Sequence, residues 1–323
     1  MTRRKRALAS AVTCWLLFIG AAEAAWPDQP VRIVVPFAAG GTTDVIARLV
    51  GEKLAPRLGQ PVVIENIGGA GGNNGAALVA KSPANGYTIL MATPGPAVMN
   101  QFMYSRMPFD TATAFAPIVT TASVPSVLVV GPKVEAKSMA ELVALMKARP
   151  DGFNFGSAGN GSTGHLGGAL FTSAVGVKAQ HVPYRGSAPM LQDLIAGNIQ
   201  FTIDTVTGVM SLIKGGTLNA LAVTTKSRSS ELPDVPTATE AGFPDVEMAS
   251  WVALLGPAGM PHEAVERINA EVNAALKEPE LQARIAGLGA RPEGGSPEDL
   301  AAFLTRETER WKRVVEIAGI RID

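Results

Sequence analysis

The chain has 323 residues, of which 47% are hydrophobic and 17% are charged, and 28 basic residues balance 28 acidic ones. This length and composition predict a globular protein with two domains or lobes, and they exclude a disordered or fibrous chain. The balanced charge gives no sign of nucleic-acid binding, and one cysteine with three histidines cannot form a disulfide framework or a Cys/His zinc site, so we expect no metal and no cofactor.

The first 24 residues have the features of a signal peptide. Residues 3–6 are all basic, residues 7–20 form an apolar run, and Ala22-Glu23-Ala24 matches the small-x-small pattern of a signal-peptidase site. The apolar run is short for a membrane-spanning helix, which needs about 20 residues. Cys14 lacks the leucine that usually stands at the third position before a lipoprotein cysteine. We therefore expect ordinary secretion with cleavage after Ala24, which removes the only cysteine.

Strands and helices alternate in the first part of the mature chain. Residues 31–35 predict a buried strand because four of the five are β-branched and apolar, and Pro36 ends it. Further strands are predicted at 62–64 and 87–91, with a helix through 76–81 between them. The first helix is indicated by apolar residues at helical spacing, which are Val45, Ile46, Leu49, Val50 and Leu54. This alternation is typical of a parallel α/β sheet with helices on its faces.

A second unit of the same kind follows and leaves a helical segment at the C-terminus. Its predicted strands are 127–130, 153–155, 199–203, 218–223 and 251–255, and its predicted helices are 139–148 and one that starts at 165. Apolar residues at helical spacing predict two further helices, within 265–276 and 300–318. We interpret the chain as an α/β protein with two lobes around a cleft, where ligands bind beyond the carboxyl ends of the strands.

A glycine turn, Phe37 to Asp44, joins the first predicted strand to the first predicted helix. Such a turn places unpaired N–H groups and the positive end of a helix at the cleft, which suits an anion. Gly40 and Gly41 would let ligand oxygens approach the backbone closely, and Thr42 or Thr43 could donate a hydroxyl group. The spacing is equally compatible with a tight connection that has a threonine cap and no ligand.

A second glycine turn spans residues 156–165 and contains Gly159-x-Gly161-x-x-Gly164, the spacing of a dinucleotide-binding motif. No acidic residue lies at 179–185, where the partner of the ribose is expected, and an exported protein has little access to nicotinamide cofactors. We therefore reject the dinucleotide interpretation. The turn is instead predicted to be a second anion-binding helix N-terminus that faces the first across the cleft.

Two further features concern single side chains. Ser162 and His165 are three residues apart and could act as a nucleophile and its base, but neither Ser157 nor Ser162 lies in a Gly-x-Ser-x-Gly motif. An exported serine hydrolase is therefore a minor alternative. Asp204 follows a predicted buried strand, where an acid must be solvated, paired or presented to a ligand. His181 carries no comparable signal.

Four stretches of the sequence resemble the Bug-type extracytoplasmic solute receptors, which are the binding proteins of tripartite tricarboxylate transporters. They are residues 26–44, 69–73, 157–162 continued by 181–189, and 221–237. The resemblance covers essentially the whole mature chain in order, so it is far more specific than either glycine motif alone.

The resemblance implies a two-lobed periplasmic-binding-protein fold, type II-like, with residues 25–124 and 251–323 in the first lobe and 125–250 in the second. It implies a monomeric periplasmic receptor, without enzymatic activity, that captures a small organic acid by backbone amides and waters and delivers it to integral membrane transporter subunits. A ligand sensor without a transport role remains an alternative.

Carried over position by position, the resemblance implies a first-lobe ligand loop with a neighbouring loop, a second-lobe ligand loop, and an acid that meets the distal part of the ligand. Tyr184, with Arg185, lines or braces the cleft. The resulting candidate ligand-binding residues are Phe37, Ala39, Gly40, Gly41, Thr42, Thr43, Thr93, Pro94, Ser157, Ala158, Gly159, Gly161, Ser162, Thr163, His165, Tyr184 and Asp204. The family usually has proline at position 38 or 39 and asparagine at position 205, where this chain has Ala38, Ala39 and Thr205, which leaves the identity of the acid open.

Overall fold

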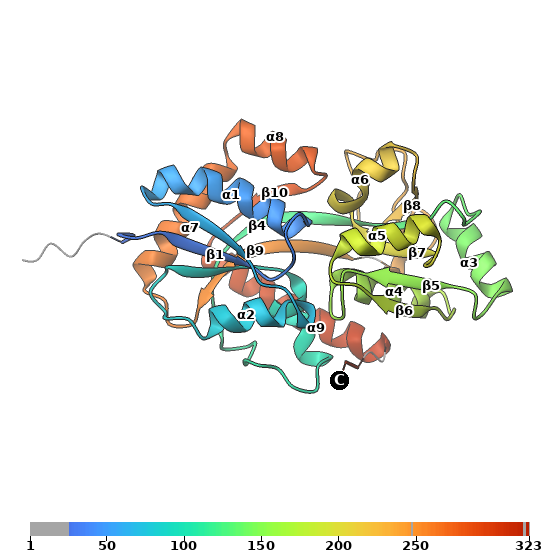
Figure 1. The fold of residues 1–323 in the computed structure, drawn as a ribbon, viewed down its shortest axis with the longest axis horizontal. Coiled ribbons are helices and arrows are strands. Elements are labelled where there is room, and N and C mark those ends of the chain that lie inside the picture. Colours follow the sequence, from blue (N-terminus) through green and yellow to red (C-terminus); the bar gives the residue numbers. More distant parts are fainter. Residues whose placement is uncertain (1–25, 247, 319–320, 323) are drawn as a thin grey trace, which may run out of the picture.

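A mixed β-sheet runs through both halves of the molecule, and helices cover its two faces (Figure 1). The computed structural model describes residues 26–246, 248–318 and 321–322, so the predicted signal peptide lies outside the described residues. The strands are β1 (Val31–Val35), β2 (Val62–Asn66), β3 (Thr88–Ala92), β4 (Phe115–Val130), β5 (Asn154–Ser157), β6 (Gln180–Pro183), β7 (Phe201–Thr205), β8 (Asn219–Val223), β9 (Ala249–Pro257) and β10 (Arg291–Gly294).

Nine α-helices and four short helical turns lie within the described residues. The α-helices are α1 (Thr42–Leu58), α2 (Asn73–Ala80), α3 (Met139–Ala148), α4 (Thr163–Ala174), α5 (Ser187–Ala196), α6 (Val206–Lys214), α7 (His262–Leu276), α8 (Pro279–Gly287) and α9 (Pro297–Ala318). The short turns are η1 (Ala70–Gly72), η2 (Gly95–Met99), η3 (Asn100–Phe102) and η4 (Pro244–Val246). In the part of the chain that the structure describes, none of these helices combines the length and apolar character needed to cross a membrane.

The sheet is only partly parallel, which corrects the sequence-based expectation. Its strand order is β2-β1-β3-β9-β4-β7-β5-β6, and β8 and β10 both pair with β4. The pairs among β1, β2 and β3 and among β5, β6 and β7 are parallel, as expected for strands joined by helices. In contrast, β4 pairs antiparallel with β7, β8, β9 and β10, and β9 pairs antiparallel with β3. Apolar runs of this length predict burial but not direction, which is why the sequence missed this reversal.

The long strand β4 connects the two halves of the sheet. From Phe115 to Pro125 it pairs with β9, and from Ser126 to Val130 it pairs with β7. The partner of β4 changes between Pro125 and Ser126, next to the lobe boundary at residues 124–125 that we expect from the sequence. We therefore keep "first lobe" for residues 25–124 and 251–323 and "second lobe" for residues 125–250 as proposed divisions.

Alternation of side chains along the strands separates the core into layers. On β9, Trp251, Ala253 and Leu255 join a core that extends across both lobes, under α2, α4 and α9. Val252 and Leu254 face the opposite way into the first-lobe core beneath α1, α7 and α8. A third core lies beneath α5 and α6 in the second lobe. The period of two along a strand buried on both faces produces this arrangement.

A local signal accounts for the start of α3. The prediction of α3 at 139–148 is confirmed: the Ser138 hydroxyl accepts the Glu141 N–H, and the Glu141 carboxylate accepts the Lys137 N–H. Helices α5, α6 and α8 and strands β6 and β10 were not predicted. The β10 sequence, Arg-Pro-Glu-Gly, has no apolar alternation, and it is a strand because of its pairing with β4.

Candidate functional site

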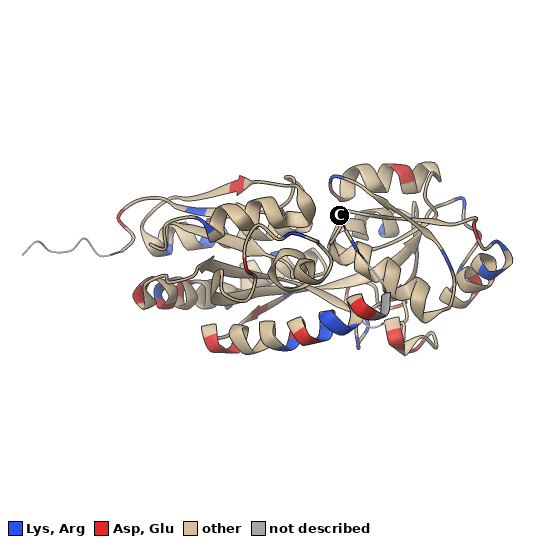
Figure 2. Cartoon of the chain, turned by 90° about the horizontal axis from the view of Figure 1, so that it is seen from below, with Lys and Arg blue, Asp and Glu red and all other residues tan. Residues whose placement is uncertain are grey.

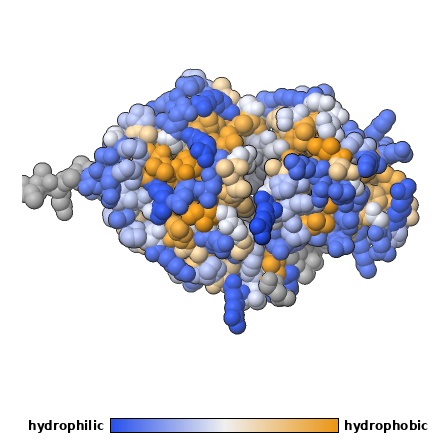
Figure 3. All heavy atoms as spheres, in the orientation of Figure 1, coloured by the Kyte–Doolittle hydropathy of each residue, from blue (hydrophilic) through white to orange (hydrophobic). Residues whose placement is uncertain are grey.

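The loops that follow β1, β3, β5 and β7 meet where the two lobes face each other. The first-lobe loop after β1 contacts the second lobe at the start of α6, and the turn after β3 contacts the loop after β5. In the space-filling view, pale residues of intermediate hydropathy lie near the middle of the molecule, next to a strongly hydrophilic group (Figure 3). Charged residues of both signs are spread over both lobes, as the ribbon in Figure 2 shows. The loops at the carboxyl ends of these strands thus lie close together, with contacts between residues of the two proposed lobes.

A buried carboxylate shapes the first-lobe loop. Asp44 accepts the Gly40 N–H at 2.9 Å and the Asn66 amide at 3.0 Å, and the Arg48 guanidinium lies 2.9 Å from it. The same Asn66 amide donates to the Phe37 carbonyl at 3.1 Å. Burial alone raises the pKa of Asp44, but these hydrogen bonds outweigh it and hold the pKa below its usual value. Asp44 therefore fixes the loop and leaves the first-turn N–H groups of α1 for a ligand.

Three threonine hydroxyls join the lobes next to that loop. Thr42, the first residue of α1, lies 2.9 Å from the Thr205 hydroxyl and is also hydrogen-bonded to Thr207. Thr205 caps α6 by accepting the Gly208 N–H at 3.3 Å. The N-termini of α1 and α6 are thereby brought together from opposite lobes. Two helix N-termini at one place favour a negatively charged group.

The second-lobe loop is held in shape by its own side chains. Ser162 caps α4 and accepts the His165 N–H at 3.3 Å, while the His165 ring nitrogen Nδ1 accepts the Gly161 N–H at 3.2 Å. The Ser157 hydroxyl donates to the Gly159 carbonyl at 3.0 Å. Ser157, Ser162 and His165 are all buried. Their buried side chains therefore hold the backbone of the loop in this conformation.

Two histidines stack beneath this loop. The rings of His165 and His181 lie 3.8 Å apart at 11°, and Phe155 stacks on His181 at 4.9 Å. His181 Nε2 lies 2.7 Å from the Ser157 hydroxyl. Burial lowers the pKa of His165 to about 4, and burial together with the neighbouring His165 lowers the pKa of His181 to about 3. Both rings are thus neutral at pH 7.

This arrangement does not form a hydrolytic pair. The Ser162 hydroxyl bonds to the His165 backbone and not to its ring. In the Ser157–His181 pair, the low pKa of His181 makes its ring a weak base, and a general base works best with a pKa near the operating pH.

Asp204 lies at the carboxyl end of β7. Its Oδ1 accepts the Thr205 N–H at 2.7 Å, and its Oδ2 is buried with no hydrogen-bond partner among the described residues. Burial raises the pKa of Asp204, although the Ser187 hydroxyl and the Thr205 N–H oppose that effect. A buried acceptor without a donor is costly, so this atom suits a ligand that carries a donor.

The other candidate ligand-binding residues differ in their contacts and in their burial. The Tyr184 hydroxyl donates to Asp193 at 2.6 Å within the second lobe, and burial together with Asp193 raises the pKa of Tyr184 to about 12. Tyr184 therefore braces the lobe. Thr163 hydrogen-bonds to Ser250 at 3.3 Å. In the first lobe, Ala39 and Gly40 are exposed, and Gly41 and Thr43 are half-buried at the start of α1. Thr93 and Pro94 are buried before η2. In the second lobe, the Ala158 carbonyl accepts the Gly186 N–H.

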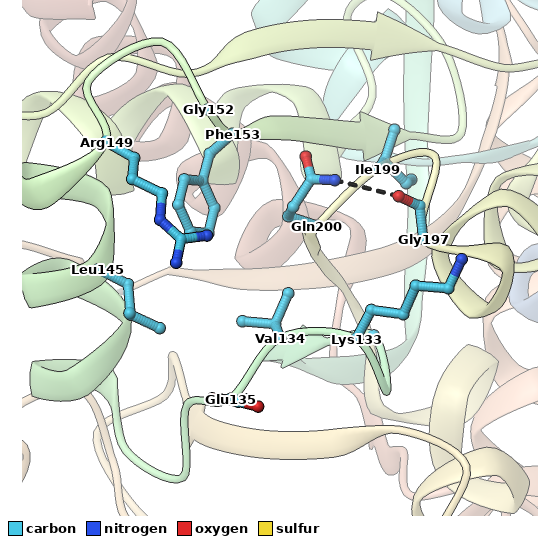
Figure 4. Close-up of a pocket in the computed structure, with 11 residues that line it drawn as sticks. Lys133, Val134, Glu135, Leu145, Arg149, Gly152, Phe153, Gly197, Ile199 and Gln200 are labelled. Atoms are coloured by element: carbon cyan, nitrogen blue, oxygen red, sulfur yellow. Dashed lines mark hydrogen bonds between the residues drawn. The ribbon is translucent and has the colours of Figure 1, made fainter.

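A cavity of about 350 Å³ lies elsewhere, among residues 131–153 and 197–200 of the second lobe. Figure 4 shows the side chains that line it. Lys133, Arg149, Phe153 and Gln200 line it, and the Gln200 amide donates to the Gly197 carbonyl at 3.1 Å. No candidate residue contributes to it, so we do not assign it to the site. Among the residues that the structure describes, no group of three or more His, Cys, Asp or Glu side chains is placed to hold a metal ion.

Sequence reasoning missed several residues at the junction of the lobes. Gly95, Asn100 and Tyr104 of the first lobe all lie against the tip of the second-lobe loop. They occupy a stretch without apolar periodicity, and no motif marks them. Their position follows only from the way the chain folds back on itself.

The chain is similar to known proteins in both sequence and structure. The model of the tripartite tricarboxylate transporter family receptor matches residues 46–320. The structure of Rpa4515 from R. palustris with adipate is 42% identical, has a TM-score of 0.89, and covers 92% of this chain and 99% of that one. The periplasmic binding protein BugD is 34% identical with a TM-score of 0.87 over 92% and 99%. MatC from Rhodopseudomonas palustris with bound malate is 32% identical with a TM-score of 0.85 over 90% and 99%.

Proposed function

The chain belongs to the family of tripartite tricarboxylate transporter receptors, and on this premise we propose that it captures a small organic carboxylate between its two lobes. The family is one of binding proteins, so the chain is a solute-binding protein and not an enzyme. The observation that carries the proposal is the meeting of the α1 and α6 N-termini, from opposite lobes, at the Thr42–Thr205 contact. Helix N-termini supply N–H donors and positive potential without a charged side chain.

We propose a dicarboxylate, or another acid with a donor at its far end, as the ligand. Two similar proteins are described with adipate and with malate, both of which carry two carboxyl groups. One carboxylate would lie on backbone N–H groups in the first turns of α1 and α4, which begin at Thr42 and Thr163. The distal part of the ligand would reach Asp204 Oδ2, which is buried and lacks a donor. A hydroxyl or a protonated carboxyl group would satisfy that atom.

The family also suggests where the protein acts and with what. Its receptors serve tripartite membrane transporters, so we propose that this protein delivers its ligand to integral membrane subunits. BugD is described as a periplasmic binding protein, and we propose the same location here, with a signal peptide cleaved after Ala24 and a monomeric mature chain.

Thermal unfolding with a panel of acids tests the proposal. The mature protein is refolded from denaturant to remove any copurified ligand and is then melted with adipate, malate, a monocarboxylate or the neutral diamide of adipic acid. A ligand at 100 times its dissociation constant stabilises the native state by about 2.7 kcal/mol. We expect a rise in melting temperature with at least one dicarboxylate and none with the diamide.

The variant Asp204→Asn tests the distal contact. Because a hydrogen bond to a charged group contributes about 1.5–3 kcal/mol and one to a neutral amide oxygen about 1 kcal/mol, we expect binding weaker by roughly twofold to thirtyfold in calorimetry. Asp245→Asn, which changes an exposed acid of the same lobe, is the matched control and should bind as the wild type does. A refolded protein that binds no acid of the panel would overturn the carboxylate proposal, and normal binding by Asp204→Asn would remove Asp204 from the site.

A further inference from the structure

The tip of the second-lobe loop, Asn160 and Gly161, packs against the first lobe. The Tyr104 hydroxyl donates across the cleft to the Asn160 carbonyl at 3.2 Å. The buried Oδ1 of Asn100 has no conventional donor among the described residues and faces Gly161 directly. A backbone C–H that points at a buried oxygen makes a weak hydrogen bond. Both contacts lie apart from Asp204 and Thr42 and at the tip of the second-lobe loop that adjoins the proposed ligand position.

Glycines are needed at this contact because the backbones of the two lobes approach each other too closely for side chains. A Cβ added to Gly71 would overlap the Asn160 carbonyl oxygen, and one added to Gly161 would overlap Asn100 Oδ1. A Cβ added to Gly95 would lie 2.8 Å from the Gly161 carbonyl oxygen. Three glycines on two lobes thus remove side chains at the same contact. The backbones of the two lobes are therefore closely packed at this contact.

The first-lobe side of the contact is rigid. The Asn100 amide donates to the Gly71 carbonyl at 3.1 Å and to Asn73 at 2.7 Å. The backbone around Tyr104 is held by Ile322, whose N–H donates to Met103 at 2.8 Å and whose carbonyl accepts from Ser105 at 3.3 Å. The C-terminal segment therefore fixes the position from which Tyr104 reaches across.

We propose that these six residues form a clasp that holds the lobes closed, in which Gly71, Gly95, Asn100 and Tyr104 of the first lobe receive Asn160 and Gly161 of the second. This inference rests on the proposed function, because closure retains the ligand. Tyr104 is a positioning residue: it acts on the ligand through the loop tip that it holds. The clasp fixes the second-lobe loop, whose Gly161 N–H and Ser162 cap define the start of α4.

Removing the hydroxyl group tests the clasp with little change in shape. A hydrogen bond contributes about 1 kcal/mol net, so Tyr104→Phe is expected to lower the ratio of closed to open molecules about fivefold. Gly95→Ala, which inserts a methyl group between the lobes, is expected to lower it at least as much. Gly95 has an ordinary φ, so a side chain there causes no backbone strain, and the nearest first-lobe atom is the Gly71 carbonyl at 3.3 Å.

The distance between the lobes reports closure directly. Cys14 is the only cysteine and lies in the predicted signal peptide, so cysteines placed at the exposed positions Lys81 in the first lobe and Ser173 in the second can be spin-labelled uniquely. Pulsed electron spin resonance then gives the distance distribution without ligand and with saturating adipate. Tyr87→Phe removes a hydroxyl that bonds to Asp28 within the first lobe, and Gly287→Ala adds a methyl group in open space, so both are matched controls.

We expect the short-distance fraction to fall in Tyr104→Phe and Gly95→Ala and to stay at the wild-type value in both controls. Equal fractions in wild type and Tyr104→Phe, both with and without adipate, would overturn the clasp. The ligand-free comparison does not depend on carboxylate binding. If no acid of the panel changes the wild-type distances or melting temperature, the proposed function fails while the clasp is still tested.

Discussion

Mild acid should destabilise this protein through the two stacked histidines, His165 and His181. In the unfolded chain each ring takes up a proton near pH 6.5, whereas the buried His165 ring does so only near pH 4. Between these values the unfolded state binds more protons, so the free energy of unfolding falls as the pH falls. Above pH 6.5 the ring is neutral in both states, and the effect vanishes.

The size of the effect follows from the two pKa values. At pH 5, a histidine whose pKa moves from 6.5 to about 4 costs the folded state about 2 kcal/mol. His181, with a pKa of about 3, adds to this cost, but its greater exposure to solvent reduces its share. The expected loss of stability from the pair between pH 7.5 and pH 5 is thus roughly 2–4 kcal/mol.

Urea unfolding followed by tryptophan fluorescence at the two pH values measures this loss. His181→Gln keeps a neutral donor near Ser157 and should lose about 1 kcal/mol less than the wild type on acidification. The double variant His165→Gln/His181→Gln should lose least, and His262→Gln, which changes an exposed ring, should lose as much as the wild type. A double variant that is as acid-sensitive as the wild type would refute the reasoning.

Two further predictions concern packing. Glu307 accepts the indole N–H groups of Trp251 at 3.3 Å and of Trp311 at 2.9 Å, so Glu307→Ala should destabilise the protein by about 1–3 kcal/mol for each unsatisfied donor in urea unfolding. An unchanged midpoint would show that water replaces the carboxylate. A Cβ at Gly168 would overlap the Phe155 ring beneath the stacked histidines, so Gly168→Ala should cost about 1–3 kcal/mol, whereas Gly287→Ala should not destabilise. Equal melting temperatures for these two variants would contradict the packing.

Where the signal is local, the sequence predicted the structure well. The apolar run at 31–35 is β1, the spacing from Val45 to Leu54 is α1, and α3 spans the predicted residues 139–148. The glycine turns after β1 and β5 both lead into helices, as their position in the sequence predicts. Each of these features depends on residues that are neighbours along the chain, so the local sequence pattern reveals them.

By itself, then, the sequence determined the α/β class, the two glycine turns at helix N-termini and the family. The tertiary structure alone decided that β4 and β9 run antiparallel through the centre of the sheet, and that Thr42 meets Thr205, Tyr104 meets Asn160 and His181 stacks on His165. Such contacts join residues far apart in the chain, and their free energy depends on how two lobes pack. No local pattern of side chains records that geometry.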